Sequence, residues 1–505
     1  MNVYSEGLIS DRPIVLNPLY VDFHEPGRDI SRLIFSGLSK YDPAKKSFVD
    51  DMAVLNVSQD RKTYLFTLKD NIKWHDGTPL TINDVYYTFH DLIQNPGFQN
   101  PILKLNFEGV DIKINKSNAI EFKLQKPNSF FITNMNVGIL PKHLLASVPI
   151  AQLPIAQFNF KPVGSGPYKI DAPIESSGNG SKQQIVLKSF DNYYDVKPKI
   201  RQIRFTAYAD LEGLSKQLST INVIAKFPNT DLSSIQKLNR FSILPYELPQ
   251  YTAVFLNTQK PHLKKNKVRL ALLKAIEKEK LLPLLKDKLA VDTPLLELNQ
   301  AEWIYRANLQ EANGALFDSG YRLGKPENPY RKNSKGEILK FNLLARIDDE
   351  NPNQSDETRK VADFIIKSWQ KVGIKIELQT VDSETFRQRL KDRDYDMVVA
   401  GQSLGYNLDT YSYWHSSQAE GKGLNLSNYK SFASDQLIEQ IRDTFDSTIK
   451  NKKLKELAAV IAKDVPAIFL YRPKYTFVTD NKIKGFELKN MTFISDRFAN
   501  IENWY

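Results

Sequence analysis

The stretch from residue 337 to residue 400 alternates between strand and helix patterns, and this order constrains the fold more than any other feature. The expected elements are, in order, a strand at 337–344, a helix from about 357, a strand at 374–378, a helix at 383–390 and a strand at 395–400. Such an order implies parallel strands joined by right-handed crossovers. The sequence therefore predicts a doubly wound α/β lobe.

A loop follows the third of these strands, which we expect to end at Gly401. Ligands on doubly wound lobes bind beyond the carboxyl ends of the parallel strands. The loop from Gly401 to His415 is therefore where a binding site is expected first. Two amphipathic helices, at about 434–446 and 450–464, come next. A short apolar strand at 467–471 then predicts that the chain leaves this lobe.

A second strong pattern runs from Tyr64 to Phe89. Apolar residues alternate with polar ones over a strand, Asp76-Gly77 predicts a turn, and Thr81 with Asp84 forms a variant capping box before a helix. Further along, Ser177–Gly180 is expected to be a hairpin tip between strands at 168–170 and 185–187.

The composition excludes several classes of protein. The 505 residues predict two or three lobes, and 41% hydrophobic residues are enough for a sizeable core. The absence of cysteine excludes disulfides, thiolate metal sites and cysteine nucleophiles. No run approaches 18 apolar residues, so no membrane span is expected. The first residues do not resemble a signal peptide, which suggests either a cytoplasmic protein or a processed mature domain.

The formal net charge of +11 favours acidic partners such as nucleic acid, anionic envelope polymers or acidic peptides. The densest basic runs, 264–267 and 450–453, lie at the starts of amphipathic helices with acids close by. We interpret them as solvated helix faces, and no nucleic-acid motif accompanies them. The sequence therefore predicts no nucleic-acid partner.

Enzyme signatures are absent. Gly164-Ser165-Gly166 is followed by Pro167 and lacks the third glycine of a dinucleotide cradle, and the six histidines share no helix face. Asp348-Asp349-Glu350 does not have the spacing of a calcium loop, and a solvated loop is the simpler interpretation. We expect no catalytic residues, no metal site and no cofactor.

Several motifs together resemble the peptide/nickel family of solute-binding proteins, family 5, which includes the oligopeptide- and dipeptide-binding receptors of ABC importers. The segment 64–85 is similar to the family's long signature, and Gly164–Tyr168 is similar to its GTGPY segment. Later landmarks follow in the expected order along nearly the whole chain, at Phe255–Asn257, Val268–Leu272, Gly373-Ile374, Asp396-Met397 and Asn428-Tyr429 with Asp435.

The resemblance implies an α/β fold, a class II clamshell like that of periplasmic binding proteins, with two doubly wound lobes and an additional small α/β domain. The first lobe would comprise residues 1–40, 162–257 and 470–505. The additional domain would comprise 41–161, and the second lobe 258–469.

The same resemblance implies binding without catalysis. The protein would capture a peptide or similar small solute by clamshell closure and deliver it to the transmembrane permease subunits of an ABC transporter. It is expected to be a monomer outside the cytoplasm, in the periplasm or at the cell surface, and anchored as a lipoprotein. A surface chaperone or adhesin that reuses the fold, and a binder of nickel or another non-peptide solute, stay open as alternatives.

The resemblance also suggests the ligand-binding residues. The loop 401–416 is similar to a family form in which an aspartate pairs with the α-ammonium group of a peptide, and Asp409 is the candidate for that role. An Asx turn that stabilises the loop is the alternative for Asp409, and a core or lobe-interface anchor is the alternative for Trp414. Asn257 and Tyr471 would lie near hinges. The predicted ligand-binding residues are Tyr20, Asn257, Gly401, Gln402, Ser403, Leu404, Gly405, Asn407, Asp409, Tyr411, Trp414 and Tyr471.

Overall fold

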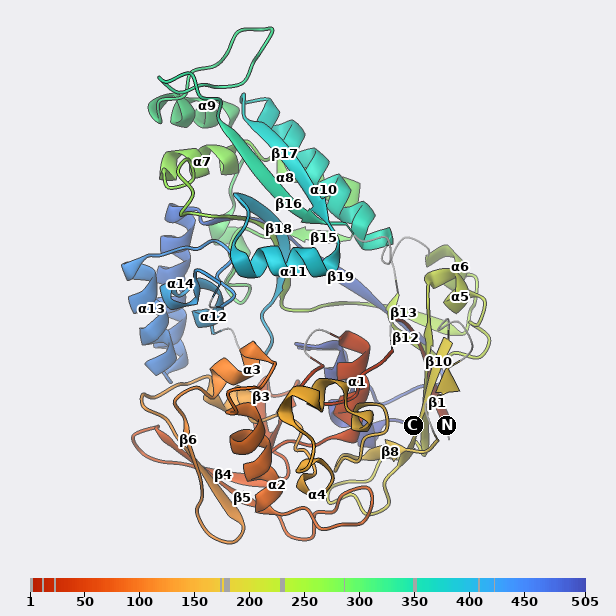
Figure 1. The fold of residues 1–505 in the computed structure, drawn as a ribbon. Coiled ribbons are helices and arrows are strands. Elements are labelled where there is room, and N and C mark those ends of the chain that lie inside the picture. Colours follow the sequence, from red (N-terminus) through yellow and green to blue (C-terminus); the bar gives the residue numbers. More distant parts are fainter. Residues whose placement is uncertain are drawn as a thin grey trace. The chain divides into compact units, whose positions relative to one another are not determined.

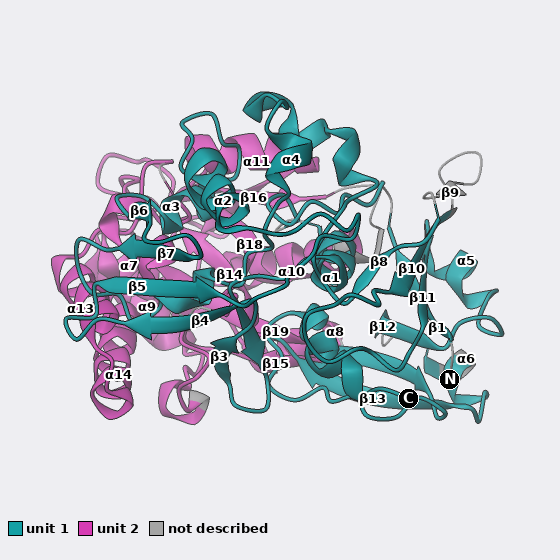
Figure 2. Cartoon of the chain, turned by 90° about the horizontal axis from the view of Figure 1, so that it is seen from below, with its two compact units in different colours: residues 1–248, 475–505 teal, residues 249–474 magenta. Residues whose placement is uncertain are grey.

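The computed structural model describes residues 3–10, 13–21, 24–172, 175–176, 182–227, 232–285, 287–347, 352–406, 409–421 and 423–505. The chain divides into two compact units, which Figure 2 shows in two colours. Unit 1 comprises residues 1–248 and 475–505, and unit 2 comprises residues 249–474. Unit 2 is longer at both ends than the predicted second lobe. The boundaries of three separate domains stay a prediction.

Unit 2 is built on a sheet with the strand order β17-β16-β18-β14-β19, and β15 also pairs with β19. β16 is parallel to both β17 and β18, as the alternating pattern predicts, whereas β14 is antiparallel to β18. The strands are β14 (Gln250–Leu256), β15 (Lys288–Ala290), β16 (Lys340–Arg346), β17 (Lys375–Val381), β18 (Met397–Ser403) and β19 (Ala467–Asp480).

Helices flank this sheet. α10 packs against β16 and β17, and α11 packs against β16 (Figure 1). Trp369 on α10 is fully buried, and its indole nitrogen donates a hydrogen bond of 2.9 Å to the carbonyl of Leu272. The helices are α7 (Asn266–Lys274), α8 (Lys278–Leu285), α9 (Leu309–Asp318), α10 (Pro352–Gln370), α11 (Ser383–Asp392), α12 (Tyr411–Trp414), α13 (Phe432–Asp443) and α14 (Ser447–Asp464).

Two strands extend beyond their predicted ends. β18 continues through Ser403 rather than ending at Gly401, because β14 pairs with it as far as Ser403. β19 continues to Asp480 rather than ending at Tyr471. Its first half pairs with β14 and β15 and its second half with β12, so one strand contributes to the sheets of both units. Partner strands far away in the sequence decide both lengths.

The main sheet of unit 1 has β1 between two parallel neighbours, β11 and β12. β10 continues the sheet next to β11, and β8 and β9 pair with β10. The predicted hairpin pairing of 168–170 with 185–187 is confirmed in the pairing of Ile170 with Leu187, whereas its tip, Ser177–Gly180, lies outside the described residues. The elements are β1 (Val3–Ile9), β8 (Tyr168–Ile170), β9 (Glu175–Ser176), β10 (Lys182–Ser189), β11 (Gln202–Tyr208), β12 (Val223–Phe227), β13 (Phe241–Glu247), α1 (Glu25–Ile34), α5 (Leu211–Ser215) and α6 (Leu232–Gln236).

Smaller sheets of unit 1 have the orders β2-β3 and β4-β5-β7-β6. The predicted strand and capped helix of 64–89 are β5 and α2, and the amide of Thr81 donates a 2.8 Å hydrogen bond to Asp84 as the capping box requires. A π-helix, η1 (Tyr87–Ile93), continues directly from α2. The elements are β2 (Ser39–Asp42), β3 (Ser47–Asp50), β4 (Ala53–Val57), β5 (Thr63–Leu68), β6 (Asp111–Ile114), β7 (Ala119–Lys123), α2 (Ile82–Tyr86), α3 (Pro101–Asn106) and α4 (Lys142–Leu145).

His75, in the turn between β5 and α2, holds the Gly164–Gly166 segment in place. Its Nδ1 accepts a 3.2 Å hydrogen bond from the amide of Gly164, and its Nε2 lies 3.0 Å from the carbonyl of Gly166. These partners fit the neutral ring with its proton on Nε2. A Cβ on residue 164 would lie 2.0 Å from the carbonyl oxygen of Ile34, so only glycine fits against the end of α1.

The replacement His75→Gln is expected to remove a pH-dependent loss of stability. Burial lowers the pKa of His75 from 6.5 to about 4. Between these two pH values His75 is protonated in the unfolded chain but neutral in the folded chain. The free energy of unfolding therefore falls by up to about 3 kcal/mol as the pH falls from about 6.5 to 4. Urea unfolding at several pH values checks this, with the exposed His90→Gln as the control. A wild-type slope retained in His75→Gln would refute the assignment.

Candidate functional site

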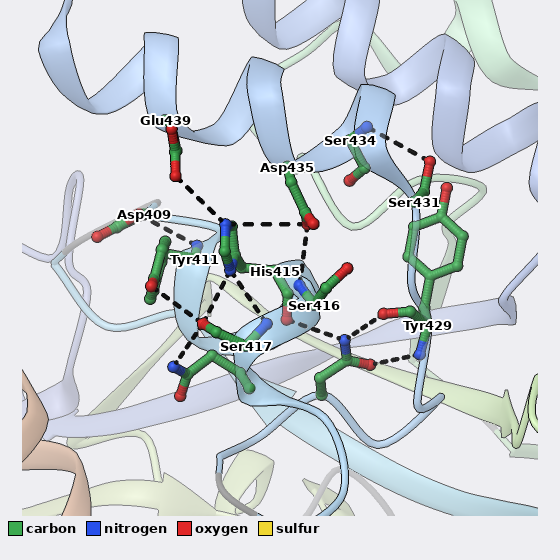
Figure 3. Close-up of polar contacts among 12 residues, drawn as sticks. Asp409, Tyr411, His415, Ser416, Ser417, Tyr429, Ser431, Ser434, Asp435 and Glu439 are labelled. Carbon is green, nitrogen blue, oxygen red and sulfur yellow. Dashed lines mark hydrogen bonds and ion pairs between the residues drawn. The ribbon is translucent and has the colours of Figure 1, made fainter.

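The candidate site is the loop that follows β18 in unit 2, together with the start of α13 (Figure 3). The first three predicted ligand-binding residues of this segment lie inside β18 rather than in the loop. Gly401, Gln402 and Ser403 pair with Thr252, Tyr251 and Gln250 of β14. From the sequence alone, Gly401 predicts the end of the strand, but pairing with β14 continues β18 beyond it.

The side chain of Gln402 is already engaged within unit 2. It is buried, and it accepts a hydrogen bond from the hydroxyl of Tyr251 and donates one of 3.4 Å to the carbonyl of Leu424. A contact between Gln402 and a ligand stays a prediction.

The loop leaves β18 through a sharp turn. The amide of Leu404 donates a 2.9 Å hydrogen bond to the carbonyl of Pro249, and Gly405 has a φ of +64°, which glycine tolerates best. The hydroxyl of Tyr413 donates a 2.8 Å hydrogen bond to the carbonyl of Ser403 and so closes the turn from the other side. Asn407 lies outside the described residues.

Asp409 is held by an arginine of α13. One carboxylate oxygen accepts hydrogen bonds from Nε of Arg442 at 2.8 Å and lies 2.7 Å from its Nη2. The other accepts a 3.1 Å hydrogen bond from the amide of Tyr411, which is the contact of an Asx turn. Only 8% of Asp409 is exposed. These contacts favour the loop-stabilising alternative, and pairing of Asp409 with a ligand ammonium group stays a prediction.

Tyr411 is covered on both faces of its ring. The Arg442 guanidinium carbon lies 3.9 Å from the ring centroid, and the His415 ring stacks at 4.2 Å with an angle of 20°. Two groups this close to one centroid must occupy opposite faces. A ligand can therefore reach Tyr411 at its edge or hydroxyl, which lies 3.0 Å from the hydroxyl of Ser417, but not by stacking.

His415 joins the loop to the first turns of α13. Its Nδ1 lies 2.8 Å from the hydroxyl of Ser417, and its Nε2 lies 3.7 Å from Glu439 and 3.9 Å from Asp435 (Figure 3). Asp435 in turn accepts a 2.9 Å hydrogen bond from the amide of Ser416. The described part of the chain contains no group of three or more histidine, cysteine or acidic side chains placed to hold a metal ion.

Trp414 lies in the interior of unit 2. It is 1% exposed, and its ring contacts Phe255, Phe469 and Tyr429 with centroid distances of 6.2, 5.9 and 6.5 Å. These contacts favour the alternative of an interior anchor. Because the anchor lies directly before His415, it fixes the end of the loop on the β14–β19 part of the sheet.

The remaining predicted residues belong to other segments of the chain than the loop. Asn257 is buried, donates to the carbonyls of Arg393 and Tyr395, and accepts from Asn428. Tyr471 on β19 donates a 2.8 Å hydrogen bond to Glu357, close to the end of unit 2.

Tyr20 belongs to unit 1, where its ring lies 5.7 Å from Phe98. Burial and the neighbouring Tyr87 raise the pKa of Tyr20 to about 12. Ligand contacts of Tyr20, Asn257 and Tyr471 stay predictions.

Three residues outside the loop organise it, and the sequence gives no sign of these contacts: Arg442, Tyr251 and Asp435, which is named above only as a landmark of the resemblance. Arg442 and Asp435 lie on a helix that the apolar periodicity predicts, but the pattern does not show which loop their side chains reach. Tyr251 lies on β14, whose partner strand β18 is far away in the sequence: Tyr251 and Gln402 are 151 positions apart. Only pairing across the fold brings these groups together.

The family model described as bacterial extracellular solute-binding proteins, family 5, middle region, matches residues 44–423. The chain belongs to this family. The match covers the four-stranded sheet β4-β5-β7-β6 of unit 1, the signature with His75, and the loop after β18. The fold is accordingly the class II fold of periplasmic binding proteins, a mixed α/β fold, as the resemblance implied.

Individual family members are similar along almost the whole chain. The oligopeptide-binding protein AppA of Bacillus subtilis is 26% identical over 98% of this chain and 90% of its own length. The dipeptide-binding protein of Escherichia coli is 25% identical over 85% of this chain and 82% of its own length. The solved structure of AppA in complex with a nonapeptide has a TM-score of 0.80 at 25% identity, with 100% of this chain and 98% of that chain covered.

The fold is also that of a solved structure with a different solute. NikZ from Campylobacter jejuni in complex with Ni(L-His) has a TM-score of 0.81 at 24% identity, and covers 100% of this chain and 99% of that one. In the chain described here, no helix among the described residues is both long enough and apolar enough to cross a membrane.

Proposed function

We propose that this chain is the substrate-binding component of an ABC importer, which captures a peptide or a similar small solute and delivers it to the transmembrane permease subunits. The observation that carries the proposal is the similarity to the oligopeptide-binding protein AppA over 98% of the chain. Peptide-binding relatives make a peptide the first ligand to test. Like its relatives, the protein would act outside the cytoplasm, and anchoring as a lipoprotein is part of the proposal.

The mechanism would be closure around the solute. The chain passes between the two units at residues 248–249 and 474–475, which are the candidate hinges. A solute that contacts both units favours the closed state only by its higher affinity for that state. A micromolar dissociation constant, about −8 kcal/mol, is sufficient for capture and still permits release to a permease.

Native mass spectrometry tests the proposal. We expect the protein to appear as a monomer with one small solute bound, either carried through purification or acquired from a mixture of short peptides. Protein unfolded in urea and refolded without solute is the control for carried ligand. Complete absence of binding to peptides and other small solutes would contradict the proposal, and so would turnover of the bound solute.

A further inference from the structure

The charge of the loop after β18 depends on a single acid. β16 and β18 are parallel, and ligands on such sheets bind beyond the carboxyl ends of the strands. Between Gly401 and Gln418 the sequence contains one acidic residue, Asp409. An ammonium group in a binding site needs a carboxylate partner for a strong charge-assisted hydrogen bond. Within the loop segment itself, Asp409 is therefore the carboxylate with which an ammonium group could pair.

That carboxylate is already compensated by a fixed cation. Arg442 contacts Asp409 through Nε and Nη2, at 2.8 and 2.7 Å. The guanidinium is also held by its position over the ring of Tyr411, a contact that does not involve Asp409. A second cation, Lys450 on α14, interacts electrostatically with both Asp409 and Glu297. An incoming ammonium group would have to displace Arg442 from this pair, in which Asp409 is buried.

The Nη1 group of Arg442 is a further hydrogen-bond donor that does not contact Asp409. Its Nε and Nη2 face Asp409, and no hydrogen bond of Nη1 is found among the described residues. The Arg442 side chain is 28% exposed, whereas that of Asp409 is 8% exposed. Arginine donates well to carbonyl and carboxylate oxygens. The Arg442 guanidinium, a hydrogen-bond donor, is thus partly exposed beside the loop, whereas the Asp409 carboxylate, the acceptor, is buried.

We propose that Arg442 sets the solute specificity of this loop, which accepts a neutral or anionic oxygen acceptor of the solute and no free ammonium group. This inference rests on the proposed function. It predicts that a peptide would not be anchored here by its α-ammonium group. A peptide with a blocked amino terminus, or a solute that carries a carbonyl or carboxylate group at this end, fits the loop.

Competition between two matched probes tests the proposal. Tetraalanine and N-acetyl-tetraalanine are mixed in equal amounts with the protein, and the two complexes are quantified by native mass spectrometry. For the wild type we expect the acetylated form to bind at least as tightly. In Arg442→Gln the carboxylate of Asp409 is released, and the free-amine form should gain at least about tenfold relative to the acetylated form, since a charge-assisted hydrogen bond contributes about 1.5–3 kcal/mol.

Two further variants keep the result interpretable. The double variant Asp409→Asn, Arg442→Gln has no carboxylate to release, so the gain should disappear. The control Glu420→Gln, which removes an exposed carboxylate paired with Lys430, should leave the preference of the wild type within about twofold. Circular dichroism of each variant confirms that it is folded.

The outcomes separate this proposal from the proposed function. A wild-type preference of tenfold or more for the free-amine form, lost in Asp409→Asn, overturns the proposal and leaves solute capture intact. Failure of Arg442→Gln, while folded, to gain any preference for the free amine also overturns it. Binding of neither peptide, with no solute retained through purification, refutes peptide capture itself, and the inference falls with it.

Discussion

Replacement of Arg497 by methionine is expected to lower the free energy of unfolding by about 3–5 kcal/mol, since removing one partner leaves buried charges uncompensated. Arg497 has no exposed side-chain surface and lies 2.7 Å from both Glu6 and Asp29. Glu6 also accepts a 2.6 Å hydrogen bond from Tyr4. In Arg497→Met, the acidic side chains of Glu6 and Asp29 would lie in the interior of unit 1 without their cation, which is why the expected loss exceeds that of ordinary surface pairs.

Two controls separate this effect from a general effect of losing an arginine. Arg201 lies 3.7 Å from Asp191, with side chains 64% and 84% exposed, and its replacement by methionine should cost less than about 1 kcal/mol. The triple variant Glu6→Gln, Asp29→Asn, Arg497→Met carries no buried charge and should recover most of the loss. Urea unfolding followed by intrinsic fluorescence measures all three. Equal losses in Arg497→Met and Arg201→Met would contradict the prediction.

The buried triad of Glu6, Asp29 and Arg497 also shows where sequence analysis ends. Glu6 and Arg497 are 491 positions apart, and nothing in their local patterns distinguishes them from exposed charges. By contrast, the order of β16, α10, β17, α11 and β18 and their parallel pairing are predictable, because local periodicity fixes each element and the handedness of crossovers fixes their connection. Short-range patterns therefore predict the elements, but not the charge pairs between them.

In the candidate site, too, one part is predictable from the sequence and another is not. Its position beyond the carboxyl end of β18 follows from the alternating pattern of strands and helices. The state of Asp409 does not, because it depends on Arg442, which lies 33 positions further on and on another helix. The length of β18 was likewise set by β14. Binding chemistry inferred from one loop therefore changes when the neighbouring elements supply the counter-ions.

Asp29→Asn is expected to change the pH dependence of stability in the direction opposite to His75→Gln. Burial is the main cause that raises the pKa of Asp29 to about 7; Arg497 opposes the shift, while Glu25 and Glu6 add to it. The folded chain therefore holds a proton that the unfolded chain has released. Stability from this group is fully present below about pH 4 and is lost as the pH rises to about 7, by up to about 4 kcal/mol.

The asparagine side chain keeps an oxygen that can accept from Arg497 and cannot ionise, so the contribution that Asp29 loses between pH 4 and 7 is absent in Asp29→Asn. The free energy of unfolding of this variant should therefore rise with pH over that range, because His75 still contributes. Since His75 contributes a change of opposite sign over nearly the same range, the wild-type profile is expected to be flatter than that of either variant. Urea unfolding from pH 4.5 to 8 measures this difference, with the exposed Asp191→Asn as the control. Parallel profiles for Asp29→Asn and the wild type would show that Asp29 is ionised throughout, and that Arg497 neutralises both carboxylates together.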